Sequence, residues 1–141
     1  MAGQPQPFAS VERPFGAGDK VKWERTVFMI ISLRVVTWCC VLGLAVLSLL
    51  PAQDMVRTGL PSRVEHLIAY AGSAAIAMAG YGATQGAPQI IGGFWVYAGV
   101  LEYLQHFSPG RHPAIGDFAA SAFGALCGGL VIALVQRRWS A

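Results

Sequence analysis

Charged residues are scarce in this chain. Asp, Glu, Lys and Arg make up 12% of its 141 residues, against roughly 25% in soluble domains. Three long stretches, 35–53, 66–101 and 118–136, contain none of the four. A soluble fold of this size keeps most of its residues near water. The shortage therefore excludes an ordinary globular enzyme, a nucleic-acid-binding protein and a disordered tail, and it indicates a polytopic membrane protein.

Alternating apolar and polar residues, the pattern of a transmembrane barrel, are also absent, and the apolar runs are rich in Gly and Ala. A hydrocarbon core about 30 Å thick needs roughly 20 apolar residues of helix. The polar, glycine-rich segment Tyr81–Gln89 divides the longest run in two. We therefore predict an all-α, four-helix transmembrane bundle, with spans at about 27–50, 63–81, 89–107 and 117–135.

The distribution of basic residues predicts the orientation. Six precede the first span or follow the last, and three lie at the other ends of the spans. Because cytoplasmic loops are enriched in Lys and Arg, both termini are expected to be cytoplasmic, in a multi-pass protein of the inner (plasma) membrane. Residues 1–24 are polar and contain three prolines. We predict a flexible tail over 1–24, with no cleaved secretory signal, and a transmembrane domain over 25–141.

Few residues suggest metal or cofactor chemistry. Cys39, Cys40 and Cys127 fall inside predicted spans, where a buried thiol is usually inert packing. The loops are too short for a nucleotide-binding fold, and no complete set of metal ligands with a known spacing is present. We expect no cofactor, no metal and no nucleic-acid partner.

The remaining polar side chains gather at one side of the predicted bundle, in the outer leaflet or just outside it. Glu102 falls inside a span, where a charge is costly, and Arg63 and Arg111 are the partners at that depth. Both a polar pocket and a purely structural ion pair remain open. The candidate binding residues are Arg63, His66, Tyr70, Glu102, Gln105, Arg111, Asp117 and Ser121.

Two stripes of small residues favour close packing at this cluster. Asp117, Ser121, Gly124 and Gly128 share one helix face, and His66, Tyr70, Ser73 and Ala77 share another. Small residues let helices approach closely in lipid. If the stripes meet, His66 and Asp117 face a common site with Glu102.

Some of these polar residues also have structural interpretations. Ser62 and Glu65 form a capping-box pattern, and Asp117 suits a helix N-terminus. Arg111 suits an interfacial anchor, and Arg34, inside the first span, suits a side chain that extends to the membrane surface.

A family resemblance follows from two segments, RVEHLIAY (63–70) and EYLQHFSPGRHPAIGDFAASAFGALCGG (102–129). They resemble the VanZ-like family of small integral membrane proteins over about half of the chain. Ser62 stands where that family commonly has Asp, and Ser121 where it usually has Asn. The resemblance implies a link to glycopeptide (teicoplanin) resistance. The matching positions are Arg63, His66, Tyr70, Glu102, Gln105, Pro109, Gly110, Arg111, Asp117, Ser121 and Gly124.

Three functions are compatible with the sequence. We favour a non-enzymatic membrane protein whose outer-leaflet polar pocket binds a membrane lipid head group or another amphiphile. The alternatives are a small accessory subunit packed into a larger membrane protein complex, and an intramembrane enzyme on a lipid-linked substrate with His66 as general base. The sequence shows no convincing nucleophile for the enzyme, and no catalytic residue is assigned.

Overall fold

The computed structural model describes residues 17–54 and 59–140. All regular secondary structure in these two ranges is helical, which confirms the prediction of an all-α protein. The elements are α1 (Ala17–Leu49), η1 (Ala52–Asp54), α2 (Ser62–Gln85), α3 (Ala87–Leu104), η2 (Gln105–Phe107) and α4 (Ile115–Ser140).

Three of the helices are long and apolar enough to cross a membrane: Gly18–Leu49, Ser62–Gln85 and Ile115–Trp139. α3 is the shortest of the four α-helices, with 18 residues. Its apolar centre lies between Pro88 and Gln89 at its start and Glu102 near its end. Length and hydropathy thus make α1, α2 and α4 candidate membrane-spanning helices.

The start of α1 differs from the sequence prediction. α1 begins at Ala17, so residues 17–24, predicted as flexible tail, are helical. Asp19 in the first turn suits the helix dipole, and no proline follows Pro14 until Pro51. Residues 1–16 of the predicted tail lie outside the described residues. At 33 residues, or about 50 Å at 1.5 Å per residue, α1 is longer than a bilayer core.

The ends of the other helices also differ slightly. α2 and α4 each begin one or two residues before the predicted span and end four or five residues after it. The predicted third span runs to residue 107, but α3 ends at Leu104 and the tighter helix η2 follows.

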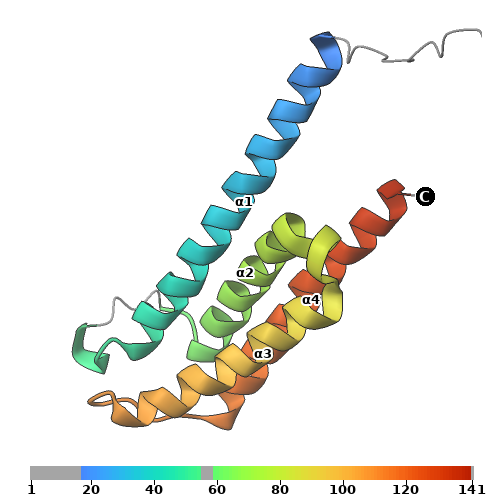
Figure 1. Ribbon diagram of the computed structural model, residues 1–141. Coiled ribbons are helices and arrows are strands. Elements are labelled where there is room, and N and C mark those ends of the chain that lie inside the picture. The colour runs from blue at the N-terminus through green and yellow to red at the C-terminus, as the bar shows by residue number, and fades with distance from the viewer. Residues whose placement is uncertain (1–16, 55–58, 141) are drawn as a thin grey trace, which may run out of the picture.

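α2 and α4 form the closest helix pair, and they run parallel (Figure 1). Their contacts advance together along both helices, from Ser62 with Asp117 to Met78 with Gln136. A Cβ atom at Gly124 or Gly128 would collide with the backbone of α2 at Leu67 or Ala71. The small-residue stripe of α4 therefore lies directly against α2, at Leu67 and Ala71.

α1 and α3 complete the bundle. α1 runs antiparallel to α2, and Gly80 brings α2 close to Leu33. The hydroxyl group of Tyr97 on α3 donates a hydrogen bond to the carbonyl of Val41 on α1. The first turns of α1 extend beyond the other helices (Figure 1). The core contains Leu44, Tyr70, Ala74, Ala77, Phe94, Ala98, Leu101 and Ala125.

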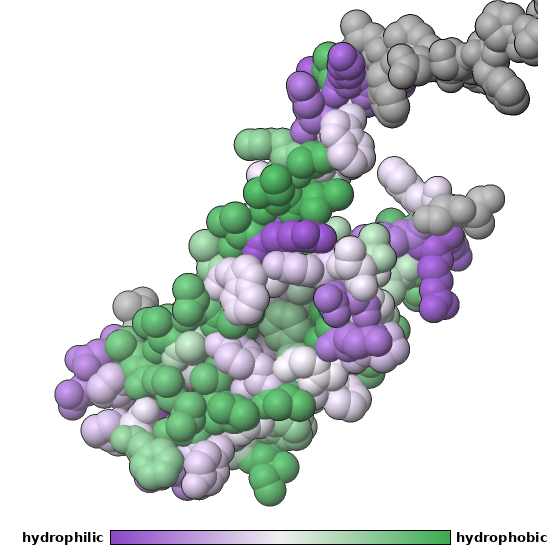
Figure 2. All heavy atoms as spheres, viewed as in Figure 1, coloured by the Kyte–Doolittle hydropathy of each residue, from purple (hydrophilic) through white to green (hydrophobic). Residues whose placement is uncertain are grey.

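The outer surface of the bundle is apolar. Figure 2 shows hydrophobic residues over much of the visible face, with hydrophilic residues at the start of α1, at the end of α4, and in smaller groups across the middle and at the opposite end of the bundle. Large apolar side chains such as Trp38, Val96 and Phe123 are exposed. In water such a surface would aggregate, whereas lipid accommodates it. The surface agrees with a membrane protein.

Candidate functional site

The first contact of the polar cluster joins the starts of α2 and α4. The Oγ of Ser62 donates a hydrogen bond to Oδ2 of Asp117 at 2.8 Å. The Nε of Arg63 lies 3.9 Å from Oδ1 of the same carboxylate. The Arg63 side chain is 72% exposed and that of Asp117 is 19% exposed. Most of the Arg63 side chain is therefore accessible.

The capping-box prediction for Ser62 is wrong. The N-cap residue of α2 is Pro61, and no side chain caps this end. The hydroxyl of Ser62 instead crosses to Asp117 on α4. The local sequence pattern predicted that the Ser62 hydroxyl caps its own helix, whereas in the folded chain it bonds to a different helix. Asp117 lies in the first turn of α4, where the helix dipole favours a carboxylate.

The second contact lies one helical turn further into the bundle. The Nδ1 of His66 is 3.2 Å from the Oγ of Ser121, and this hydroxyl donates to the backbone oxygen of Asp117 at 2.9 Å. Because the single hydroxyl hydrogen of Ser121 is used there, its oxygen accepts from His66, whose Nδ1 then carries the hydrogen. Ser121 is only 2% exposed.

Tyr70 connects the cluster to the core. Its side chain is buried, its ring lies nearly parallel to that of His66 with centroids 6.4 Å apart, and the edge of Phe94 packs against it at 6.2 Å. Tyr70 is therefore a core residue beside the cluster.

Glu102 joins the end of α3 to the start of α4. Its carboxylate accepts a hydrogen bond from the backbone amide of Ala114, the residue before α4. This bond gives a structural reason for a carboxylate at this depth, because a charge-assisted bond to a backbone amide offsets part of the desolvation cost. Gln105 follows in η2 and is buried.

Arg111 stabilises the end of α1. Its Nε donates to the carbonyl oxygen of Leu50 at 3.1 Å and its Nη2 donates to that of Leu47, while Ser108 Oγ donates to Leu49 at 3.0 Å. The last carbonyls of a helix lack internal partners and favour a nearby cation. α1 has no basic residue in its own last turn, so Arg111 supplies this cation from the turn before α4.

The structure therefore divides the predicted site residues. Arg63, His66, Asp117 and Ser121 form one connected group between α2 and α4. Glu102 reaches that group through the start of α4, whereas Arg111 contacts α1 at the same end of the bundle. Ser62 and Ser108 have side-chain contacts here that sequence reasoning did not assign. The sequence signal that could have indicated a role for Ser108 is the turn Ser108–Arg111, in which Gly110 has φ of +72°.

Arg34 lies at the other end of the bundle, where its side chain binds a helix. Its Nε donates to the carbonyl oxygen of Gly80 at 3.1 Å, and its guanidinium lies 4.8 Å from the centre of the Tyr81 ring. Trp38 also donates to the hydroxyl of Tyr81. Arg34 thus fastens α1 to α2 by a hydrogen bond and a cation–π contact.

Two further findings bear on the site. Within residues 17–54 and 59–140, no three His, Cys, Asp or Glu side chains are grouped so that they could hold a metal ion. No protein-family model, no curated protein and no solved structure matches this chain. The functional argument consequently depends on the geometry of the cluster.

Proposed function

We propose that this chain is a non-enzymatic, VanZ-like protein that spans the inner (plasma) membrane four times. The parallel course of α2 and α4 supports four spans. If both helices cross the membrane in the same direction, the segment between them must cross back. α3 has 18 residues, about 27 Å of helix, which is close to the roughly 30 Å of a hydrocarbon core.

The proposed orientation has both termini in the cytoplasm. An even number of spans leaves the two ends of the chain on one side, and the basic residues at the start of α1 and the end of α4 favour the cytoplasmic side. The polar cluster, at the opposite end of the bundle, then lies at the outer rim.

The proposed activity is binding of an anionic lipid head group, or of another anionic amphiphile, at this outer rim. The observation that carries it is the exposed side chain of Arg63, whose Nε lies 3.9 Å from Oδ1 of Asp117. A Cβ atom at Gly116 would lie 2.7 Å from the Arg63 Nε, so the guanidinium lies directly over the first turn of α4. Arginine and the start of a helix both favour a phosphate group.

The other residues of the cluster position Arg63 and hold the helix ends. Asp117 and Ser62 keep α2 and α4 aligned, and the bond from His66 to Ser121 does so one turn deeper. Glu102 fixes the segment before α4. In this proposal Arg63 binds the ligand, and Arg111 keeps α1 beside the site.

Photochemical crosslinking tests the proposal. The full chain is placed in bilayers that contain phosphatidylglycerol with a photoreactive group on its head, and adducts are mapped by mass spectrometry. We expect adducts on residues 60–63 and 115–118 that fall at least about fivefold in Arg63→Gln, since one surface arginine contributes about 1 kcal/mol. Arg25→Gln, the same charge change at the start of α1, is the control. Equal labelling in the wild type and Arg63→Gln would refute the proposal.

A second candidate function is an accessory subunit of a larger membrane protein complex. The projecting start of α1 favours it, because this end extends beyond the other helices and exposes Trp23 and Phe28. A partner helix could pack along it. Purification in a mild detergent discriminates: a protein retained at fixed stoichiometry, and lost in Trp23→Ser with Phe28→Ser, supports the subunit.

A further inference from the structure

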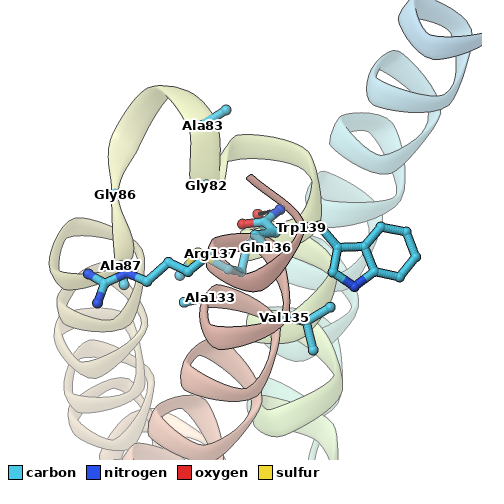
Figure 3. Close-up of a pocket in the computed structure, with 10 residues that line it drawn as sticks. Gly82, Ala83, Gly86, Ala87, Ala133, Val135, Gln136, Arg137 and Trp139 are labelled. Carbon is cyan, nitrogen blue, oxygen red and sulfur yellow. Dashed lines mark hydrogen bonds between the residues drawn. The ribbon is translucent and has the colours of Figure 1, made fainter. Parts of the chain in front are cut away.

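A cavity of about 720 Å³ opens at the end of the bundle opposite the polar cluster. It lies between the last turns of α2, the first turn of α3 and the last turns of α4 (Figure 3). Binding sites for small molecules commonly enclose about 300–1,000 Å³. The cavity is thus large enough for a head group and the first part of an acyl chain.

The cavity exists because the residues around it are small. Gly82, Ala83, Gly86, Ala87 and Ala133 form much of its wall. Gly86 alone joins α2 to α3, with φ of +75°, a conformation that L residues with side chains rarely adopt. The helices reverse within this one residue.

The end of α4 is fixed beside this space. The Nε2 of Gln136 donates a hydrogen bond to the carbonyl oxygen of Met78 at 3.2 Å. Gln136 and Met78 both line the cavity. This contact ties the last turns of α4 to α2. It therefore fixes the backbone of the following residue, Arg137, beside the cavity.

The charge of the cavity is positive. Among the described residues that line it, Arg137 is the one with a charge, and none is acidic. Figure 3 shows the Arg137 side chain extending from α4 towards Gly86 and Ala87, where α3 begins. That helix start has no side-chain cap, and the positive end of its dipole adds to the guanidinium. Both features favour an anion.

The cavity also lies beside the end of a candidate membrane span. The candidate span of α4 ends at Trp139, which lines the cavity, and tryptophan is enriched where a membrane meets water. Deeper in the bundle the wall is apolar, with Met78 and Ala133. A charged entrance above an apolar wall is suited to an amphiphile.

We propose that this cavity binds an anionic phospholipid of the leaflet that contains the end of α4. Its phosphate contacts the Arg137 guanidinium and the start of α3, and its acyl chains run along Met78 and Ala133. This site is separate from the outer-rim site, because the two lie at opposite ends of α2 and α4.

Native mass spectrometry of the delipidated full chain tests this site. The Arg63→Gln background is used, so that lipid bound at the outer rim is not counted. We expect saturable binding of one phosphatidylglycerol, at least about fivefold tighter than phosphatidylcholine. Arg137→Gln should lower the affinity by at least the same factor. Arg138→Gln, the same change at the next residue, should retain binding because Arg138 does not line the cavity.

A second variant separates loss of the site from loss of folding. Ala83→Leu fills part of the cavity from an exposed position, and we expect it to weaken binding without lowering thermal stability. Equal weakening in Arg137→Gln and Arg138→Gln would overturn the proposal, since general surface charge would explain it. Displacement of the lipid by millimolar inorganic phosphate at equal affinity would overturn the assignment to a phospholipid. Absence of saturable phosphatidylglycerol binding would overturn both the proposed site and its assignment to a phospholipid.

Discussion

The Nδ1 of His66 lies 3.2 Å from the Oγ of Ser121, across the parallel interface of α2 and α4. A histidine beside a serine is the arrangement of a nucleophile and its base. The sequence placed both residues in the candidate site and suggested His66 as the base of an alternative enzyme, but it showed no convincing nucleophile. Its surroundings argue for a structural role. Ser121 is 2% exposed, and its hydroxyl hydrogen is directed to the backbone of Asp117. Substrate cannot reach that oxygen in this conformation.

The first prediction is that this contact contributes to stability and not to hydrolysis. His66→Ala leaves the buried Ser121 oxygen with one partner fewer and should cost about 1–3 kcal/mol. His66→Asn retains a nitrogen donor near the position of Nδ1 and should cost less. Thermal unfolding in detergent measures both. A fluorophosphonate probe should leave the wild-type protein unlabelled, and labelling that disappears in Ser121→Ala would instead establish a serine hydrolase.

The second prediction concerns the crossing of α2 and α4. Gly128→Ala places a methyl group against the backbone oxygen of Ala71, so the helices must separate, at a cost of about 1–3 kcal/mol. Gly72→Ala is the matched control, because a Cβ there meets nothing within 4 Å. Thermal unfolding in the same detergent compares the two. Equal stability of both variants would contradict the close crossing.

The third prediction separates the charge of Glu102 from its hydrogen bond. Glu102→Gln retains an oxygen that accepts from the Ala114 amide, so we expect most of the stability to remain. Glu102→Ala removes the acceptor and should cost about 1–3 kcal/mol. Thermal unfolding measures the difference. If Gln is as damaging as Ala, the negative charge itself is needed, and an ion pair becomes the better interpretation.

The sequence predicted the helices better than the contacts of their polar side chains. Three stretches without charge located the helices, and the small residues at Gly124 and Gly128 indicated the crossing. Both signals depend on the composition of a short segment, so they can be recognised without knowing the rest of the fold. The partners of Ser62 and Arg111 could not be predicted in this way. Their contacts lie 55 and 61 residues away in sequence, and local pattern assigned Ser62 to its own helix end.

The partner of Glu102 illustrates the same limit. Charge complementarity favoured an arginine for this carboxylate, but the amide of Ala114 bonds to it. Every residue except proline carries a backbone amide, so sequence cannot distinguish which one a carboxylate will meet. The direction of the chain after η2 decides it. That direction follows from the packing of α4 on α2, which depends on the whole bundle.

The fourth prediction is that the two ends of the described chain lie on the same side of the membrane. Single cysteines at Lys20, Gln53 and Arg138 are introduced after Cys39, Cys40 and Cys127 are replaced by alanine. A membrane-impermeant maleimide should label Gln53→Cys in spheroplasts, and should label Lys20→Cys and Arg138→Cys only after permeabilisation. In the wild-type protein, which retains its native cysteines, we expect no labelling, because maleimide needs a hydrated thiolate. With three spans, the positions at Lys20 and Arg138 would react from opposite sides, and the proposed return of α3 across the membrane would be wrong.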